Sequence, residues 1–248
     1  MELDDNENDN VNEGKEDSIG RRMQYAVVGA WLLVKESCAL LAKLVEISPP
    51  PPLTDNSSLN DSGVTKSTSN ETYLLTTDEI SHIGAVILDA LSRLKHNGAI
   101  AEAQASLQSV CESVLKYSGR SDVALCRLPL VWINNLIDKL NGEQQVFILR
   151  RSAGFAFSFL SLLRSEPKNC KPILLPLAMN VLFEYAMKGI GNVDDDKNQQ
   201  PAINVLEGTA WRTVVHSLNI MRLIILDATL GPDLHPYMSQ ATKIAVRG

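Results

Sequence analysis

The sequence predicts an all-α protein, arranged as an α-solenoid of HEAT- or armadillo-like helix pairs. The 248 residues are 45% hydrophobic but only 5% aromatic, a composition that favours packed helices over strands rich in aromatic and β-branched residues. Apolar residues recur along most of the chain at the three- and four-residue spacing of one helix face. Two of the predicted helices, with their turn, occupy about 40 residues, which is the length of a HEAT or armadillo repeat.

Residues 1–20 are predicted to be a disordered acidic tail. Residues 1–17 contain eight acidic side chains and one basic side chain, so they account for the net charge of −6 and the rest of the chain is nearly neutral. A dense run of like charge is typical of a solvated arm. A globally basic nucleic-acid-binding protein is therefore not indicated.

Residues 21–48 are predicted to form the first helix of the solenoid. Its longest apolar run, residues 25–34, is about half the length of a membrane span, and the acidic N-terminus lacks the positive region of a secretory signal. We therefore expect a cytoplasmic protein with no membrane contact. The helix is punctuated by four charged residues, Lys35, Glu36, Lys43 and Glu46.

Residues 49–75 are predicted to be a disordered linker. Four consecutive prolines at 49–52 end the first helix, and the following stretch is rich in Ser, Thr and Asn. With so few apolar side chains, the segment cannot offset the entropy that is lost on ordering.

Residues 76–248 are predicted to form the helical-repeat domain. Thr76 and Glu79 have the spacing of a capping box, which marks a helix start, and Asn97-Gly98 marks a break between two helices. The apolar stripes on either side of this break are Ile80, Ile83, Ile87, Leu88, Leu91 and Leu94, and Ile100, Ala103, Leu107, Val110, Cys111 and Val114. Further helices are predicted over residues 129–140, 146–165, 172–188, 211–228 and 234–246.

Prolines and glycines set the expected ends of these later helices. Pro129 suits a first helical turn, Asn141-Gly142 suits a C-terminal cap, and Pro176 is expected to kink its helix. Residues 189–200 are expected to form a polar loop. Residues 146–149 also fit a short strand.

The motifs of several enzyme classes are absent from the sequence. It has no phosphate-binding loop, no dinucleotide fingerprint, no nucleophile elbow and no H-E-x-x-H zinc motif. We therefore predict no catalytic residue, no cofactor and no metal site. The cysteines lie far apart without a C-x-x-C pair and are expected to be reduced and mostly buried; they are Cys38, Cys111, Cys126 and Cys170.

A short run of two arginines and three small residues is the first candidate binding site. Two adjacent guanidinium groups cannot both face an apolar groove, so at least one needs a carboxylate, a phosphate or water. The small residues allow another helix or a ligand to approach the backbone. An ion-paired helix with a tight helix crossing explains the same residues without any ligand. The run is Arg150, Arg151, Ser152, Ala153 and Gly154.

A second candidate lies on the predicted helix 211–228. His216, Asn219 and Arg222 are polar residues three apart on an otherwise apolar helix, so they can line one ridge of it. Alternatively, His216 and Asn219 cap or cross-link neighbouring helices.

Several separated motifs in order resemble the thyroid adenoma-associated protein (THADA) family, in its DUF2428-type region. The resemblance covers residues 22–248, and Ala156 stands where the family's R-R-S-A-G motif ends in proline. The family's proteins are far longer, so this chain is expected to be a fragment or a shortened relative. The matching segments are R-R-S-A-G at 150–154, L-R-S-E-P at 163–167, V-H-S-L-N-I at 215–220 with Arg222, Asp227 with Leu230-Gly231, K-H-N-G-A at 95–99 and V-K-E at 34–36.

The resemblance implies a non-catalytic scaffold. Family members partner an FtsJ-type methyltransferase and direct 2′-O-methylation to nucleotide 32 in the tRNA anticodon stem-loop. Carried over by residue, Arg150, Arg151, Ser152 and Gly154 would grip tRNA phosphates or shape the contact with the methyltransferase, and arginine suits phosphate through its bidentate fork.

The alternative function is an α-solenoid module that binds a protein or peptide without RNA. The surface around the two arginines would discriminate between these functions. A basic strip that includes Arg164, Lys168 and Lys171 would favour RNA, whereas an apolar groove would favour a peptide.

Overall fold

The computed structural model describes residues 9–48, 74–116, 124–141, 153–190 and 210–247, and all regular secondary structure in these ranges is helical. The all-α prediction is therefore confirmed for the described part of the chain. Residues 146–149, which also fit a strand, lie outside it, as do residues 49–73 of the predicted linker. The elements are α1 (Asp9–Ile47), α2 (Thr77–Arg93), α3 (Asn97–Leu115), η1 (Ala124–Arg127), α4 (Leu128–Asn141), α6 (Ala153–Arg164), α7 (Leu174–Ile190), α8 (Ala210–Ile225), α9 (Gly231–Leu234), η3 (His235–Tyr237) and α10 (Met238–Arg247).

Helix α1 is the longest element and begins much earlier than the sequence predicts. The predicted disordered tail covers residues 1–20, but α1 starts at Asp9. The segment contains the helix formers Glu13, Lys15 and Glu16, and acidic residues near a helix N-terminus interact favourably with the helix dipole. The early start therefore has a local physical reason.

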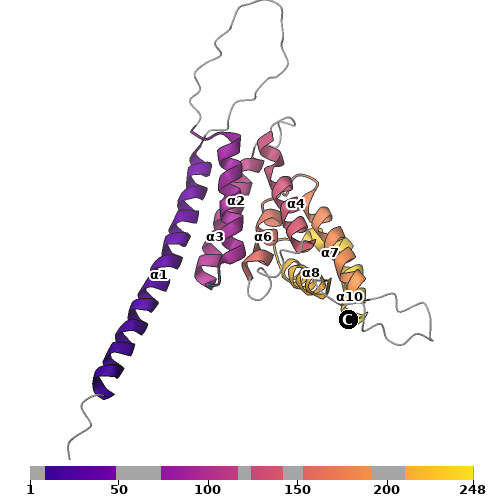
Figure 1. The fold of residues 1–248 in the computed structure, drawn as a ribbon. Helices are drawn as coiled ribbons and strands as arrows, with labels where there is room; N and C mark the ends of the chain where they lie inside the picture. Colours follow the sequence, from indigo (N-terminus) through magenta and orange to yellow (C-terminus); the bar gives the residue numbers. More distant parts are fainter. Residues whose placement is uncertain (1–8, 49–73, 117–123, 142–152, 191–209, 248) are drawn as a thin grey trace, which may run out of the picture.

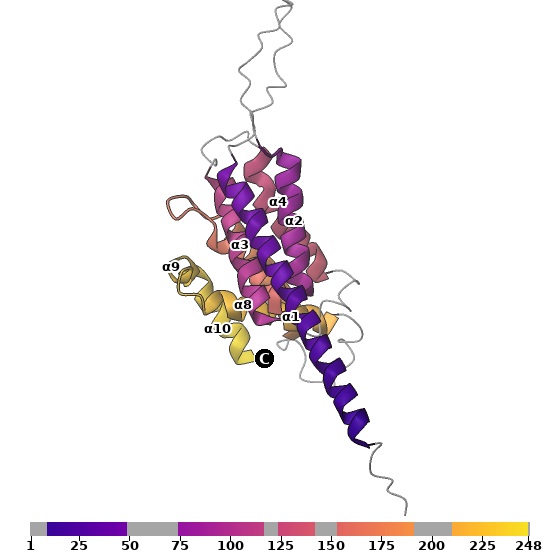
Figure 2. The ribbon, with the colours of Figure 1, turned by 90° about the vertical axis from the view of Figure 1, so that its left-hand side faces the viewer.

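The N-terminal half of α1 projects beyond the helices that its C-terminal half contacts (Figures 1 and 2). Cys38, Ala42 and Val45 are buried in the core, whereas residues 20–30 are exposed. Residues 20–47 are long and apolar enough to cross a membrane, but the core helices of soluble proteins can have the same length and composition. This stretch is longer than the apolar run that the sequence analysis considered.

Helices α2 and α3 follow the sequence pattern closely. The Glu79 amide donates to Thr76 Oγ1 at 3.2 Å and the Thr76 amide donates to Glu79 Oε2 at 2.8 Å, which completes the predicted capping box. Leu94 is partly buried and every other residue of the two predicted stripes is buried. These stripes face the core because residues three and four apart share one side of a helix.

The later helices agree with the sequence in place but not in every end. Pro129 lies in the first turn of α4, as predicted. Pro176 is the third residue of α7, so its missing amide removes no bond from the helix interior and the expected kink is not required. Helix α8 ends at Ile225, before the predicted end. The predicted last helix, 234–246, is replaced by the end of α9, by η3 and by α10. Pro236 has no amide to donate and lies in the first turn of η3.

Helix α6 lies in the middle of the assembly (Figure 1) and contacts α2, α3, α4, α7 and α8. Helix α3 lies between α1 and α6, and α7 packs along α8 and α10. The largest fully buried side chains include Phe155 and Phe159 of α6, whose rings meet edge to face with their centroids 5.6 Å apart. One continuous core therefore joins the helices, and α6 is at its centre.

Candidate functional site

The R-R-S-A-G segment leads into α6, and its glycine packs against another helix. A Cβ atom built on Gly154 would lie 2.1 Å from the Leu91 carbonyl oxygen of α2, a distance that no side chain tolerates. The residue is buried. The small residues could allow either a helix or a ligand to approach the backbone. At Gly154 the structure shows a helix, α2. Arg150, Arg151 and Ser152 lie outside the described residues.

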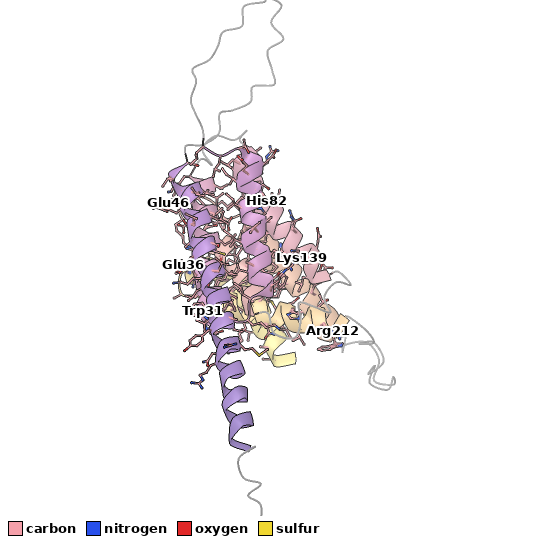
Figure 3. All side chains as sticks on the ribbon, turned by 60° about the vertical axis from the view of Figure 1, so that its left-hand side comes forward. Trp31, Glu36, Glu46, His82, Lys139 and Arg212 are labelled. Carbon is pink, nitrogen blue, oxygen red and sulfur yellow. The ribbon has the colours of Figure 1, made fainter. Side chains whose placement is uncertain are left out.

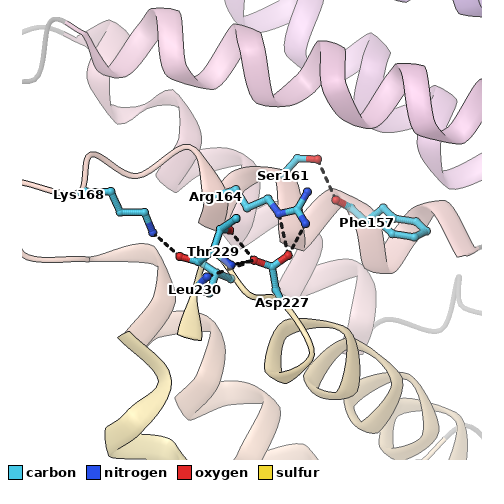
Figure 4. Close-up of polar contacts among 7 residues, drawn as sticks. All are labelled: Phe157, Ser161, Arg164, Lys168, Asp227, Thr229 and Leu230. Atoms are coloured by element: carbon cyan, nitrogen blue, oxygen red, sulfur yellow. Dashed lines mark hydrogen bonds and ion pairs between the residues drawn. The ribbon is translucent and has the colours of Figure 1, made fainter. Parts of the chain in front are cut away.

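The C-terminal end of α6 holds a polar cluster that joins it to the segment after α8 (Figure 4). Arg164 Nε donates to Asp227 Oδ2 at 2.9 Å, and Arg164 Nη2 bonds the same oxygen. The other carboxylate oxygen accepts the Thr229 amide at 3.0 Å, the Leu230 amide at 3.2 Å and the Thr229 hydroxyl. We call Arg164, Asp227 and Thr229 the α6 clasp. It joins two family-like motifs that are 63 residues apart.

The Asp227 carboxyl is ionised in this environment. Burial raises its pKa, but hydrogen bonds from Arg164 and Thr229 together with the Arg164 charge outweigh that effect and hold the pKa below its usual value. The Asp227 side chain is only 4% exposed, whereas that of Arg164 is 30% exposed. The charge of Asp227 is therefore compensated within the protein, and the clasp is a structural contact.

Glu166, in the same L-R-S-E-P motif, caps the start of α7. Its carboxylate accepts the amides of Ile173 at 2.6 Å, Leu174 at 2.8 Å and Leu175 at 3.2 Å. The next residue is Pro176, which has no amide to donate. The glutamate thus satisfies the free donors of the first turn, where its negative charge also complements the helix dipole.

The basic strip that would favour RNA is largely engaged within the protein. Arg164 is paired with Asp227, and Lys168 Nζ donates to the Thr229 carbonyl at 2.9 Å and lies 3.5 Å from Asp233 Oδ2. Lys171 is exposed. Two of the three predicted cations therefore hold the fold together, and their charges are partly neutralised by carboxylates.

The outward side of α8 carries the second candidate site together with exposed apolar residues. Asn219 and Arg222 are exposed, while His216 is half-buried at the edge and burial lowers the pKa of its imidazole. The same side exposes three apolar residues, Trp211, Val215 and Leu218, that the sequence analysis did not single out. Their spacing of four and three residues gives the signal that was available. We call Trp211, Val215, Leu218, Asn219 and Arg222 the outer α8 face.

The outer α8 face is opposite the side of α8 that enters the core. Ser217, Ile220, Met221 and Ile224 are buried, whereas Trp211 is 45% exposed with the Arg212 guanidinium 5.4 Å from its ring centroid. Near the start of the helix, Thr213 Oγ1 donates to the Leu140 carbonyl at 3.2 Å, and Figure 3 shows Lys139 and Arg212 on the same side of the molecule as each other. The face combines apolar area with cations, a mixture that suits a protein partner.

The K-H-N-G-A motif serves to attach α1. The His96 ring stacks on Trp31 of α1 with a centroid distance of 4.2 Å and an interplanar angle of 9°. Lys35 and Glu36 of the V-K-E motif form an ion pair at 3.3 Å. The K-H-N-G-A motif therefore contacts α1 at Trp31, three residues before the V-K-E motif begins.

The described residues contain no group of three His, Cys, Asp or Glu side chains that could hold a metal ion. The four cysteines are free, and only Cys170 is exposed. The burial of Cys111 raises the pKa of its thiol.

Comparison with known proteins gives one consistent result. A family model described as THADA/TRM732, DUF2428 matches residues 1–248. Relatives named tRNA (32-2′-O)-methyltransferase regulator THADA are 27% identical in Mus musculus and 28% in Canis lupus familiaris, each over 91% of this chain and 10% of the relative. The relative with this name in Drosophila melanogaster is 25% identical over 91% of this chain and 12% of its own length.

The chain thus spans about a tenth of the length of these curated relatives. No solved structure matches it. Because the family model covers the whole chain, and the segments that resemble the family hold α6 and α1 in place, the chain belongs to the THADA/TRM732, DUF2428 family.

Proposed function

We propose that this chain acts as a non-catalytic scaffold that supports 2′-O-methylation of nucleotide 32 in the tRNA anticodon loop by an FtsJ-type methyltransferase. The observation that carries the proposal is the family match over the whole chain, together with the name of the relatives, which are regulators of a tRNA (32-2′-O)-methyltransferase. Since the chain matches about a tenth of those relatives, the methyltransferase, the tRNA and a cytoplasmic location all belong to the proposal.

The architecture supports a scaffold. Most described helices pack on helices near them in sequence, as α2 does on α3 and α7 on α8, and such nearest-neighbour packing is the basis of an α-solenoid. We propose that the chain is a solenoid segment of HEAT or armadillo type. Solenoids present extended surfaces to their partners. In this chain the outer α8 face would form part of such a surface.

We assign the methyltransferase contact to the outer α8 face. Its apolar residues Trp211, Val215 and Leu218 would leave water on docking, and aromatic and arginine side chains provide much of the binding energy at protein interfaces. Asn219 and Arg222 would supply polar contacts, with His216 at the edge. We assign the tRNA contact to Arg150, Arg151 and Ser152. Arg164 and Lys168 are less suited to it, because they already contact Asp227 and the Thr229 carbonyl within the protein.

The methyltransferase contact is tested by co-purification of the full chain with an FtsJ-type methyltransferase. Replacing Leu218 by Glu places a charge in the proposed interface, and co-purification should fall at least tenfold while the melting temperature changes little. Val86→Glu is the matched control, because Val86 is 40% exposed and lies on a different helix, α2. Equal loss in both variants, or loss in neither, would contradict the assignment.

The tRNA contact is tested by replacing Arg150 and Arg151 with Ala in the full chain. We expect weaker tRNA binding and a flatter dependence of affinity on salt, because fewer counterions are released when fewer phosphates are contacted. Co-purification with the methyltransferase should persist. Intact tRNA binding with lost methyltransferase binding would move these arginines to the protein interface.

The second candidate function is a protein- or peptide-binding module without RNA. The apolar character of the outer α8 face is the observation that favours it. This function predicts that Leu218→Glu abolishes binding of a protein partner while nucleotide 32 methylation in cells is unchanged. Quantification of that modification in tRNA by mass spectrometry distinguishes the two functions.

A further inference from the structure

Helix α1 has two apolar faces, and the described residues of the chain cover only one of them. The inner face packs into the core through Cys38, Ala42 and Val45. On the opposite side Leu33, Leu40 and Ile47 are 69%, 62% and 59% exposed. These three residues recur every seven positions, the period at which one stripe of a helix faces a partner helix. The covered and the uncovered stripes are both regular.

Two charged residues complete the uncovered stripe. Glu36 and Lys43 each lie three residues after a leucine of the stripe, so they fall between the apolar positions in the second place of a heptad seam. Their side chains are 69% and 61% exposed. We call Leu33, Glu36, Leu40, Lys43 and Ile47 the outer α1 face.

We propose that the outer α1 face pairs with the same face of a second copy of this chain, in antiparallel orientation. An antiparallel pair centred near Leu40 brings Glu36 of each copy beside Lys43 of the other. A parallel pair in register would instead place Glu36 beside Glu36 and Lys43 beside Lys43, which is repulsive. The face is therefore self-complementary about a two-fold axis, as a symmetric dimer interface requires.

The position of α1 and the charge of its N-terminal segment agree with this pairing. Helix α1 lies at one side of the assembly (Figure 1), so its outer face is directed away from the other helices. Residues 1–17 carry eight acidic side chains and one basic side chain. A parallel pair would bring two such segments together, whereas an antiparallel pair directs them to opposite ends.

A second copy suits this face better than a lipid surface. Glu36 and Lys43 lie in the middle of the face, where they pair within α1 with Lys35 at 3.3 Å and with Glu46 at 3.0 Å. Moving such ion pairs into lipid carries a large desolvation cost, whereas a second copy adds a further opposite charge to each and covers Leu33, Leu40 and Ile47 at the same time. The paired length is short, so we expect a weak, reversible dimer.

The test is sedimentation equilibrium of the full chain over a range of concentrations. The wild-type chain should show a reversible monomer–dimer equilibrium, and Leu40→Glu should weaken it at least tenfold. The control is Leu226→Glu, which places the same charge at a residue that is 70% exposed after α8 and should leave the dimer constant unchanged. Circular dichroism confirms that each variant is helical.

Charge reversal tests the orientation. Glu36→Lys alone and Lys43→Glu alone should each weaken the dimer about tenfold, because each creates two like-charge contacts. The double variant restores opposite charges and should recover the wild-type dimer constant. Three results would overturn the proposal: a wild-type chain that is monomeric at all concentrations, a dimer that Leu40→Glu leaves intact, or a monomer that binds vesicles of phosphatidylcholine and phosphatidylserine through this face.

Discussion

Helix α6 and residues 20–47 of helix α1 are both strongly apolar, but the protein uses them in opposite ways. Helix α6 has 12 residues and is held at both ends, by the Gly154 contact with α2 and by the α6 clasp. Helix α1 has 39 residues and is held along one face of its C-terminal half. The described apolar side chains of α6 are buried or partly buried, whereas several of those in α1 are exposed to solvent.

The comparison teaches which helix defines the fold and which is available for docking. Backbone contact and buried ion pairs tolerate little change, because they leave no room and no alternative partner. An exposed apolar face tolerates substitution in the isolated protein and matters when a partner arrives. Substitutions in α6 should therefore reduce stability strongly, whereas substitutions in α1 should have small effects of either sign.

The largest effect is expected for Arg164→Met in the α6 clasp. This change leaves the buried Asp227 carboxylate without its cation, and breaking such a pair costs about 3 kcal/mol. Urea unfolding measures the loss. In the double variant Arg164→Met/Asp227→Asn the unpaired charge is gone, so the loss should be smaller; an equal or larger loss would show that the unpaired Asp227 charge is not what destabilises the single variant.

The same pair should shape the response of stability to acid. The pKa of Asp227 is lowered in the folded state, so its contribution is present above the pKa of an unfolded aspartate, about 3.9, and is lost as the pH falls through the folded-state pKa. The wild-type free energy of unfolding should therefore decline more steeply below about pH 4 than that of Asp227→Asn. If the free energy of unfolding of the two proteins fell in parallel with pH, the titration of Asp227 would not be coupled to folding.

The second largest effect is expected at the other end of α6. Gly154→Ala places a methyl group against the Leu91 carbonyl oxygen, so α2 and α6 must separate, at a cost of about 2 kcal/mol. Thermal unfolding monitored by circular dichroism gives the change. An unaltered melting temperature would mean that the two helices move apart freely, which would remove the contrast between α6 and α1.

A smaller effect is expected for Trp31→Ala, which removes the stack between α1 and His96. Aromatic pairs of this kind contribute about 1 kcal/mol beyond their buried area. The matched control is Trp211→Ala, because Trp211 is exposed on α8 and its removal should change stability by less than about 0.5 kcal/mol. Hydrogen exchange in α1 should increase in the first variant and stay unchanged in the second.

The smallest effect, and the one with opposite sign, is expected in α1 itself. A Cβ atom on Gly29 would have open space around it, and alanine favours a helix interior over glycine by about 1 kcal/mol. Gly29→Ala should therefore raise the free energy of unfolding slightly. A loss of stability would indicate that this side of α1 is already in contact with something, and would sharpen the search for a second copy.

Much of the helical pattern could be predicted because it depends on neighbours within one turn. The capping box of Thr76 and Glu79 involves residues three apart, and Pro129 falls where a first turn accepts it. The start of α1 could not be predicted from composition, because the acidic residues of 9–20 indicate a solvated arm whereas the helix formers among them favour a helix. The start of α7 was predicted two residues too early, at 172 instead of Leu174. Pro176 was therefore expected to kink the helix, although it lies in the first turn, where proline is tolerated.

The candidate site could be predicted only in part. The sequence identified small residues at 152–154 and polar residues on α8, but left open whether a helix or a ligand approaches Gly154. The structure gives the answer for Gly154 and adds the exposed apolar residues Trp211, Val215 and Leu218. The roles of Arg150, Arg151, His216, Asn219 and Arg222 in binding stay predictions.

The sequence by itself determined the helices, their inner faces and the family, because helix periodicity and short motifs are properties of nearby residues. Only the tertiary structure decided that Arg164 pairs with Asp227 and that Gly154 packs against α2. It also decided that α1 and α8 each have an apolar face that the described residues do not cover. These outcomes depend on how successive helices cross, and a contact between residues 63 positions apart leaves no trace in local spacing. For that reason Arg164 was expected to lie in a basic strip, whereas in the fold it is the cation of a buried carboxylate.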